Sequence, residues 1–493
     1  MENTETSHAR LREHFLRFRG GVVGTEHQIE TPFGQKPLVY LDWTASGRLY
    51  SDIEHHMTYV LGPLVGNTHT ESTATGDAMT RAYHNARECI KRHVGANEND
   101  VLILEGSGMT GVIVKLHRMM GLKIPNWITR TFSPSVLRFC ASLGRAASIK
   151  PVVFVSHLEH HSNQTSWLET IADVVIVPPG EDGLFSLENL AAGLKKYSRR
   201  KVKIGSFSAC SNVTGIETPV HDIARMMHEH GGVCLVDYAA SGPYAQIKMH
   251  TDCKAEQLDA IFLSPHKALG GPGSPGIMVV NASLIRSTIP DRPGGGTVSW
   301  TNPWGGRAYV ADIEAREDGG TPPFLQTIRA GLAFNLKEEM GVAQIAERKS
   351  HLLELLFQEL DTVPGLNILA GNMRKRQAIV SFYFEDIHYG LLVKMLNDRF
   401  GIQTRGGCSC AGTYGHYLMG VDRRRSSEIT CRIDRGDNSI KPGWVRVSLH
   451  PTNTEEEILY LGQALREITT KVHEWSRSYQ YDPTTNEYHF IAV

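Results

Sequence analysis

The sequence predicts an α/β protein that has a large domain with a mainly parallel sheet and a smaller α+β domain at the C-terminal end. Between about residues 80 and 280, short apolar runs rich in β-branched residues alternate with amphipathic stretches, as in a parallel sheet wrapped by helices. A Gly/Pro-rich region at 290–323 then interrupts the alternation, and a different order of elements follows. At 493 residues the chain is also too long for one ordinary domain.

Six apolar runs are predicted to be buried strands of the large domain, because Val, Ile and Leu dominate parallel strands that are covered on both faces. The runs are 101–104, 152–155, 174–177, 202–204, 233–236 and 261–263. Helices are expected between them; apolar residues recur at helical spacing from Ala82 to Val94, and Gly95 ends that pattern. Ligands of such sheets bind at the carboxyl ends of the strands, so functional residues are expected there.

The C-terminal third is predicted to be the small α+β domain. It shows a long helical pattern at about 327–360, a strand at 378–383, a helix from about Tyr389, a glycine-rich loop and a last strand near Arg446. Thr454 and Glu457 have the spacing of a capping box, which predicts the start of a closing helix.

Three segments are therefore expected along the chain. Residues 1–40 form an N-terminal segment that packs with the small domain, residues 41–325 form the large domain, and residues 326–493 form the small domain.

Composition argues against partners that bind through bulk charge. The formal net charge is -1, so no nucleic-acid or acidic-membrane partner is expected. The run from Arg423 to Arg425 has acidic neighbours and is interpreted as a solvated loop. The polar N-terminus does not resemble a signal peptide, and no stretch approaches the roughly 18 apolar residues that cross a bilayer. We expect a cytoplasmic protein whose eight cysteines are free thiols.

Lys267 is the strongest candidate for a catalytic residue. It follows the strand at 261–263 in the segment Ser264-Pro265-His266-Lys267, and a glycine-rich stretch comes after it. A lysine at the end of a buried strand can form an imine when desolvation lowers its pKa. A surface lysine is the alternative.

Two further motifs fit a phosphorylated aromatic cofactor. Asp237 ends the strand at 233–236, where a carboxylate suits a protonated pyridine nitrogen; a turn or helix-capping aspartate is the alternative. The segment Gly106-Ser107-Gly108-Met109-Thr110 lies between a strand and a helix, where free backbone N–H groups and the Thr110 hydroxyl would hold a phosphate. Tight turns also use glycine.

His160 and two cysteines are the remaining candidates. His160 follows a strand, and its imidazole suits stacking on a flat ring and proton relay. Cys408 and Cys410 lie among glycines in a loop that is expected to be exposed and mobile, where a thiol is reactive; spare loop thiols are the alternative. Neither the adjacent histidines nor the Cys-x-Cys pair has partners at metal-ligand spacing, so no metal site is expected.

Taken in order, these motifs resemble the class V aminotransferase fold, an aspartate aminotransferase-like fold of pyridoxal 5'-phosphate (PLP) enzymes, and within it the cysteine desulfurase and selenocysteine lyase branch. The resemblance covers roughly residue 41 to the end and begins with Leu41-Asp42-Trp43-Thr44-Ala45. It implies cofactor contacts from Met109, Thr110, His160, Asn212, Asp237, Ser264, His266 and Lys267, with Lys267 as the Schiff-base lysine.

The resemblance also implies a homodimer, a substrate site and a nucleophile. Thr321 resembles the threonine that reaches the neighbouring subunit's phosphate. Arg446 matches the arginine that clamps the substrate carboxylate, and Asn212 also lies near the substrate. Cys410 follows Arg405 by five residues, as the nucleophilic cysteine does in that branch, and Ala411 fits the same pattern.

Three features depart from the branch. Ala240 stands where the family has a glutamine, Cys408 and Ser409 replace a histidine pair, and the segment 411–445 is longer. In an extended loop, Cys408 and Cys410 would point to one face.

The implied reaction converts L-cysteine to L-alanine and leaves the sulfur on Cys410 as a persulfide, with a possible sulfur-acceptor protein as partner. Two alternatives stay open. One is another class V enzyme acting on an amino acid, such as a C–S lyase, epimerase or aminotransferase. The other is a non-catalytic sulfur carrier or regulatory protein with the same fold.

Overall fold

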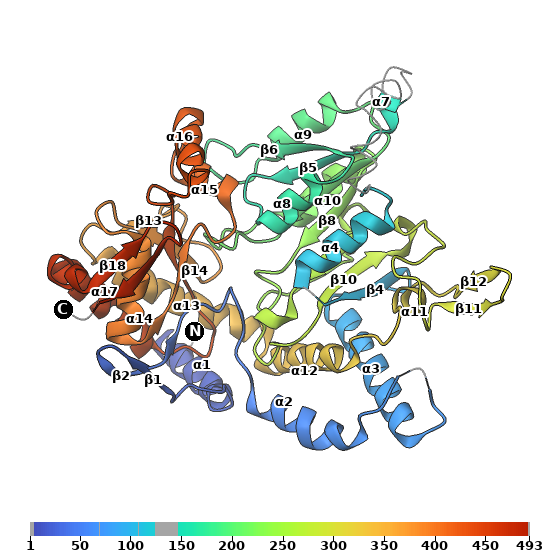
Figure 1. Cartoon of the computed structure of the whole chain (residues 1–493), viewed down its shortest axis with the longest axis horizontal. Helices are drawn as coiled ribbons and strands as arrows, with labels where there is room; N and C mark the ends of the chain where they lie inside the picture. Colours follow the sequence, from blue (N-terminus) through green and yellow to red (C-terminus); the bar gives the residue numbers. More distant parts are fainter. Residues whose placement is uncertain (1–3, 69, 107, 124–145, 492–493) are drawn as a thin grey trace. The chain divides into compact units, whose positions relative to one another are not determined.

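A computed structural model describes residues 4–68, 70–106, 108–123 and 146–491. They form two compact units (Figure 1). The small unit comprises Met1–Tyr50, Ser211–Glu217 and Met340–Val493, and the large unit comprises Ser51–Cys210 and Thr218–Glu339. The sequence prediction placed the domain boundaries at 40/41 and 325/326. The short segment Ser211–Glu217 is assigned to the small unit because its backbone carbonyls accept hydrogen bonds from Gln377 and Ser381.

The described part of the large unit is built on a seven-stranded sheet in the order β4-β10-β9-β8-β7-β5-β6. Its strands are β4 (Asp100–Glu105), β5 (Val152–Ser156), β6 (Asp173–Val177), β7 (Lys203–Ser208), β8 (Val233–Asp237), β9 (Ala260–Leu263) and β10 (Gly276–Asn281). Only β10 is antiparallel to its neighbours, so the other six strands, β4 included, run in one direction. The predicted mainly parallel sheet is confirmed; β10 was not predicted.

One of the six predicted strands is not buried as expected. β6 forms an edge of the sheet, and Ile176 in it is 37% exposed. An edge strand has a neighbouring strand on one side only. The apolar run at 174–177 does not indicate whether its strand lies at the edge or in the middle of the sheet.

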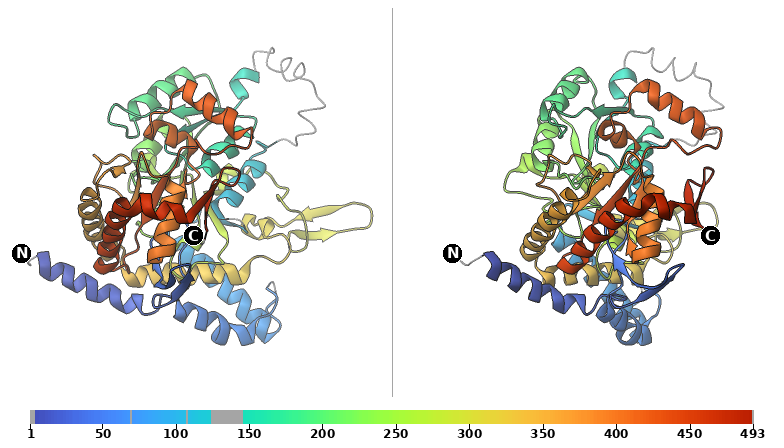
Figure 2. Two further views of the ribbon diagram at one scale, coloured as in Figure 1. Left: turned by 60° about the vertical axis from the view of Figure 1, so that its left-hand side comes forward. Right: turned by 90° about the vertical axis from the view of Figure 1, so that its left-hand side faces the viewer.

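Helices cover both faces of this sheet. Side chains alternate along each strand, so Leu102 and Leu104 pack on one face with α3, α9, α10 and α12, while Ile103 packs on the other with α4 and α8. The helices are α2 (Ser51–His55), α3 (Ala74–His93), α4 (Gly108–Met119), α7 (Ala146–Ile149), α8 (His161–Leu168), α9 (Leu187–Lys196), α10 (Val220–Glu229), α11 (Ile313–Glu317) and α12 (Phe324–Met340). A hairpin of β11 (Val298–Thr301) and β12 (Arg307–Tyr309) projects from this unit (Figures 1 and 2).

The small unit contains an antiparallel sheet in the order β13-β14-β17-β16. Its strands are β13 (Asn367–Ile368), β14 (Ile379–Tyr383), β16 (Arg405–Gly407) and β17 (Trp444–Ser448). The short strand β3 (Val39–Tyr40) pairs with β15 (Ile402–Gln403). Two hairpins complete its strands, β1 (Gln28–Thr31) with β2 (Gly34–Pro37) and β18 (Tyr479–Asp482) with β19 (Glu487–Phe490).

The described helices of this unit are α1 (Thr4–Arg19), α13 (Val342–Asp361), α14 (Tyr389–Phe400), α15 (Gly412–Leu418), α16 (Arg423–Ile433) and α17 (Glu455–Trp475). A hydrophobic core in this unit includes Leu356 of α13, Leu396 of α14 and Leu461 of α17. The capping box of Thr454 and Glu457 is confirmed at the start of α17. Within the described residues, no helix has the length and apolar character that spanning a membrane requires.

The helical stretch predicted at about 327–360 is present as two helices. Gly341, whose φ is 78°, ends α12 before α13 begins. One sequence interpretation in this unit is wrong. Arg423 to Arg425 form the first turn of α16 and not a loop, because the Asp422 side chain accepts from the backbone N–H of Arg425 and caps the helix. The three arginines are exposed, as expected for solvated charges.

Candidate active site

The carboxyl edge of the large-unit sheet gathers most of the predicted cofactor residues. β4, β5, β8 and β9 all end at this edge, because they run in one direction. Met109 follows β4, His160 follows β5, Asp237 ends β8 and Lys267 follows β9. Residues that are up to about 160 positions apart in the sequence therefore meet at one place, as the parallel topology predicts.

Lys267 and Asp237 interact electrostatically at this edge. Lys267 ends a short 3₁₀ turn, Pro265–Lys267, and its backbone N–H donates to the Ser264 carbonyl over 3.0 Å. Asp237 is buried, and the backbone N–H of Ala239 donates to its Oδ1 over 2.8 Å. Burial raises the pKa of Asp237, while that N–H and the Lys267 ammonium act in the opposite direction. A buried carboxylate of this kind favours a positively charged ligand beside it.

The start of α4 forms the other end of this region. The backbone N–H of Met109 donates to Ser264 Oγ over 3.1 Å, which ties the helix N-terminus to the segment that precedes Lys267. Gly108 has a φ of 61°, and a Cβ there would lie 3.4 Å from the His266 ring and 3.6 Å from Ser264 Oγ. The helix N-terminus, Ser264 and His266 therefore converge around a residue without a side chain, and a helix N-terminus favours an anion such as phosphate.

His160 is held in one orientation by Ser162. The backbone N–H of Ser162 donates to His160 Nδ1 over 3.1 Å, and this bond caps α8. Because an N–H can only donate, Nδ1 must be the acceptor, so the neutral ring carries its proton on Nε2. Ser162 Oγ lies 3.1 Å from the same nitrogen and 2.6 Å from Thr110 Oγ1. Thr110 and His160 are thus joined through one serine, a link that was not predicted.

Glu159, which was not among the predicted site residues, supports His160. Its carboxylate is fully buried and accepts hydrogen bonds from Ser156 Oγ (2.5 Å), Ser208 Oγ (2.6 Å) and Asn163 Nδ2 (2.6 Å). Burial raises the pKa of Glu159, and these donors oppose the shift. The carboxylate joins the ends of β5 and β7 to α8, and so positions the turn that presents His160. Glu159 stands directly before His160 in the sequence, which was the only available signal.

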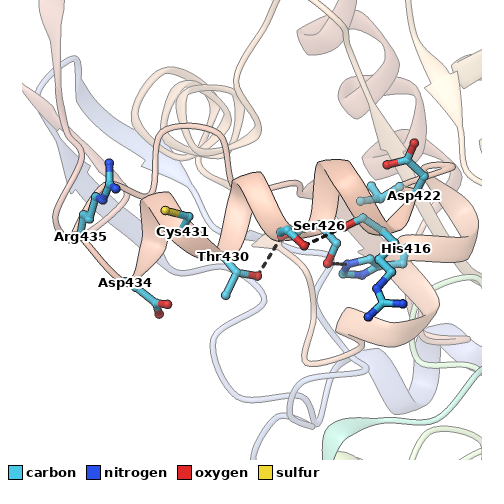
Figure 3. A pocket seen from close by; sticks show the side chains of 10 residues that line it. His416, Asp422, Ser426, Thr430, Cys431, Asp434 and Arg435 are labelled. Carbon is cyan, nitrogen blue, oxygen red and sulfur yellow. Dashed lines mark hydrogen bonds between the residues drawn. The ribbon is translucent and has the colours of Figure 1, made fainter.

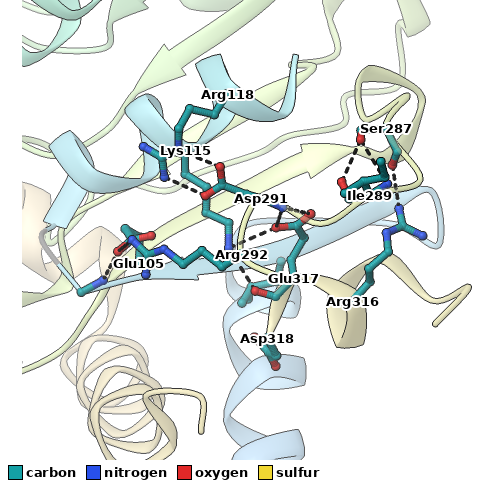
Figure 4. A network of polar contacts seen from close by, with 12 residues as sticks. Glu105, Lys115, Arg118, Ser287, Ile289, Asp291, Arg292, Arg316, Glu317 and Asp318 are labelled. Carbon is teal, nitrogen blue, oxygen red and sulfur yellow. Dashed lines mark hydrogen bonds and ion pairs between the residues drawn. The ribbon is translucent and has the colours of Figure 1, made fainter. Parts of the chain in front are cut away.

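Thr321 is exposed on a segment that ion pairs hold in place. It lines a cavity of about 480 Å³ together with Gly106, Glu105 and Arg292. A polar network next to it joins α4 to the residues before Thr321 (Figure 4). In this network Lys115 Nζ lies 3.3 Å from Glu317 Oε2 and donates to the Glu317 carbonyl, and Arg118 pairs with Asp291.

Asn212 and Arg446 belong to the small unit and contact each other. Arg446, on β17, is 3% exposed; its Nη1 donates to the Asn212 carbonyl over 3.1 Å, and its Nη2 lies 2.7 Å from Asp42 Oδ1. Burial lowers the pKa of Arg446, and Asp42 opposes that shift. Asp42, for which no role was predicted, engages the guanidinium group predicted to bind a substrate carboxylate.

The predicted cysteine loop takes the form of a tight turn at Ser409 and Cys410. Ser409 and Cys410 have φ angles of 50° and 56°, in the left-handed region, and the backbone N–H of Ala411 donates to the Cys408 carbonyl over 3.0 Å. Ser409 is buried and anchored by two bonds: Asn212 Nδ2 donates to its carbonyl (2.7 Å) and Trp444 Nε1 to its Oγ (3.2 Å). Cys410 is exposed and Cys408 half-buried. Strained backbone of this kind is typical of functional sites.

His416, on α15 after the cysteine loop, contacts α15 and α16. Its Nδ1 lies 2.7 Å from the Gly412 carbonyl and its Nε2 lies 2.9 Å from Ser426 Oγ on α16. Figure 3 shows the ring at one end of a cavity of about 560 Å³ along α15 and α16, which neither Cys408 nor Cys410 lines.

The residues present fit a phosphorylated pyridine cofactor. The buried carboxylate of Asp237 and the N-terminus of α4 lie at the same sheet edge as Lys267. In the small unit, Asn212 Oδ1 is buried and has no hydrogen-bond partner among the described residues, so it is available to a ligand donor. Across the residues that the structure describes, no cluster of three or more His, Cys, Asp or Glu is arranged to hold a metal ion.

Curated relatives of the chain are cysteine desulfurases by description. A probable cysteine desulfurase of Staphylococcus epidermidis is 26% identical over 446 residues, which cover 89% of this chain and 94% of the relative. A probable cysteine desulfurase of Halalkalibacterium halodurans is 26% identical over 380 residues, or 76% of this chain and 84% of the relative.

Solved structures show the same fold. The apo cysteine desulfurase of Thermococcus onnurineus has a TM-score of 0.69 at 19% identity and covers 88% of this chain and 95% of its own. The Escherichia coli cysteine desulfurase CsdA, in an S-sulfonic acid form, has a TM-score of 0.69 at 20% identity. It covers 92% of this chain and 98% of its own. These likenesses confirm the predicted fold of PLP-dependent transferases.

The model of the aminotransferase class V family matches residues 135–461. That range contains His160, Asn212, Asp237, Lys267 and Arg446, while Met109 and Thr110 precede it. Because the match covers more than half of the chain, the chain belongs to the class V aminotransferase family, a family of PLP-dependent enzymes.

Proposed function

We propose that this chain is a cysteine desulfurase-like enzyme that converts L-cysteine to L-alanine and transfers the sulfur to Cys410. The observation that carries the proposal is the electrostatic pairing of a buried carboxylate, Asp237, with Lys267 at the carboxyl edge of the sheet. The relatives' descriptions and the exposed thiol in a strained turn support the desulfurase subtype.

PLP is the cofactor in this proposal. Lys267 would hold it covalently, Asp237 would face its pyridine nitrogen, and Met109, Thr110, Ser264 and His266 would hold its phosphate. His160 would stack on the ring, and Asn212 would contact the ring hydroxyl. When bound, PLP supplies an electron sink that stabilises negative charge at the substrate α carbon.

The chain's own residues supply the remaining steps. Arg446 would bind the carboxylate of the amino-acid substrate through its guanidinium fork. Lys267 would move a proton at the substrate α carbon, and His160, with its proton on Nε2, would serve as a second proton carrier. The Cys410 thiolate would attack the substrate sulfur, so that the carbon–sulfur bond breaks and the sulfur remains on Cys410 as a persulfide.

The proposal includes a homodimer, because Thr321 is expected to serve the neighbouring subunit's phosphate. Thr321 is exposed, and the backbone N–H of Gly320 donates to the Gly295 carbonyl over 2.9 Å, which joins two glycine-rich segments. A sulfur acceptor and a cytoplasmic location also belong to the proposal.

The deciding experiment incubates the purified protein and PLP with a panel of amino acids and identifies the products. Desulfuration of L-cysteine yields L-alanine, β-lysis yields pyruvate and ammonia, and epimerisation yields the D-amino acid. Borohydride reduction should attach the cofactor to Lys267, and Lys267→Ala should abolish turnover. A protein that binds no PLP and turns over no amino acid would favour the non-catalytic alternative.

A further inference from the structure

A groove of about 650 Å³ lies beside the cysteine turn, entirely within the small unit. Both Cys408 and Cys410 line it. One wall is β16, an edge strand of the small-unit sheet, and the opposite wall is β19 with the turn before it. Tyr389 and Val393 of α14 also line the groove. Its volume is in the range of small-molecule sites, about 300–1,000 Å³.

Both walls are fixed in place. Asn486, in the turn between β18 and β19, donates from Nδ2 to the Tyr389 hydroxyl over 2.5 Å, and the rings of Tyr488 and His388 lie 5.4 Å apart. On the other side, the bonds from Asn212 and Trp444 hold Ser409. Because Ser409 is anchored, the turn that carries the two cysteines is held at the groove.

The groove carries an excess of positive charge. Lys394, Arg405 and Lys441 line it, against the single carboxylate of Glu487. Lys394 is partly neutralised by Asp398, 3.1 Å away, and Arg405 lies 3.9 Å from Asp42. Lys441 is half-buried and contributes its charge from a loop. Such a lining favours an anion and disfavours a cation.

We propose that this groove, named here the thiol groove, binds a small anionic thiol that takes the sulfur from Cys410. The proposal rests on the proposed desulfurase function for the origin of that sulfur. The thiolate of the ligand attacks the outer sulfur of the Cys410 persulfide and forms a new sulfur–sulfur bond. The bond between the outer sulfur and Cys410 Sγ breaks, Cys410 leaves as a thiolate, and the ligand departs as a persulfide that keeps the proton. No oxidant or reductant is needed.

The first test examines the groove without requiring catalysis. The full-length protein is alkylated with iodoacetate, an anion, or with iodoacetamide, its neutral analogue, and each cysteine is quantified by mass spectrometry. The exposed Cys253 and Cys431 lie outside the thiol groove and serve as internal references. We expect Lys441→Gln to lower the iodoacetate rate at Cys410 by about two- to fivefold, as for loss of one surface charge, and to leave the iodoacetamide rate and both references unchanged.

Lys471→Gln is the matched control, since Lys471 pairs with Glu467 on α17 outside the groove. It should change neither rate. If Lys441→Gln leaves the iodoacetate rate at Cys410 unchanged, the groove does not select anions and the proposal is overturned.

The second test measures the transfer itself. Protein loaded with ³⁵S from labelled L-cysteine is discharged with 2-mercaptoethanesulfonate, 2-mercaptoethanol or cysteamine, which are anionic, neutral and cationic thiols of similar size. Lys441→Gln should slow discharge by the sulfonate by about two- to fivefold, leave mercaptoethanol unchanged and not slow cysteamine. Equal slowing of all three thiols overturns the proposal.

The two tests also separate the inference from the proposed function. If no alanine or label is obtained from L-cysteine, the desulfurase function fails, while the alkylation result still decides whether the groove selects anions. If alanine forms but Lys441→Gln affects neither the alkylation of Cys410 by iodoacetate nor the discharge by the anionic thiol, only the proposed thiol groove is refuted.

Discussion

Replacing Asp42 with asparagine should weaken the protein and strengthen its binding of amino acids. Asp42 Oδ1 lies 2.7 Å from Arg446 Nη2, and the two side chains are 15% and 3% exposed. Arg446 is predicted to bind the substrate carboxylate, so the Asp42 carboxylate competes with substrate for the same guanidinium group. Removing its charge ends that competition and leaves a buried cation without its counter-ion.

The stability effect follows from this geometry. Loss of one partner from a buried ion pair costs about 3–5 kcal/mol. Asparagine retains an oxygen that accepts from Arg446, and Arg446 keeps its bond to the Asn212 carbonyl, so we expect about 2–3 kcal/mol. For a unit of this size, that corresponds to a fall in Tm of about 4–12 °C. If about 1 kcal/mol of this lost stability is regained when the substrate carboxylate binds Arg446, the KM for L-cysteine falls roughly fivefold.

Two measurements check this prediction. Alanine formation gives the KM, and thermal unfolding with and without L-alanine gives the stabilisation by a bound amino acid, which should be larger in Asp42→Asn than in the unmodified protein. Asp437→Asn is the control, because its pair with Arg432 is exposed and should contribute at most about 1 kcal/mol. A lower Tm with an unchanged or higher KM would refute the reasoning, since Asp42 would then be purely structural.

Three further predictions concern other parts of the chain. Cys410→Ala should abolish alanine formation from cysteine and preserve the cofactor absorbance, while Cys408→Ala should be milder; mass spectrometry after one turnover should find the sulfur on Cys410, and full activity of Cys410→Ala would exclude a persulfide mechanism. Subunits lacking Lys267 mixed with subunits lacking Thr321 should regain activity, whereas a fully active monomer at high dilution would contradict the shared site. Burial lowers the pKa of Lys337 from 10.5 to about 7, so the unfolded chain binds more protons between these values and stability rises with pH there. Lys337→Met lacks this rise, so its free energy of unfolding in urea should fall further below that of the unmodified protein at pH 9 than at pH 7. An equal difference at both pH values would refute the pKa shift.

Sequence patterns that span a few residues were sufficient to predict much of the fold. The apolar runs predicted β4, β5, β7, β8 and β9, because burial on both faces requires apolar side chains at successive positions. The capping box was predicted because both of its hydrogen bonds lie within four residues. The direction of the strands then placed Lys267, Asp237 and His160 at one edge, since parallel strands share their carboxyl ends.

Contacts between segments that are distant in the chain could not be predicted from the sequence. Asp42 and Arg446 are 404 positions apart, and no local pattern shows that the aspartate engages the predicted carboxylate clamp. The left-handed turn at Ser409 and Cys410 is anchored by bonds from Asn212 and Trp444, which no pattern within the segment indicates. Likewise the apolar run at 174–177 does not show that β6 is an edge strand or that Ile176 in it is 37% exposed. Residue type and spacing record what a segment prefers alone, whereas strand order and long-range hydrogen bonds arise only when the chain has folded.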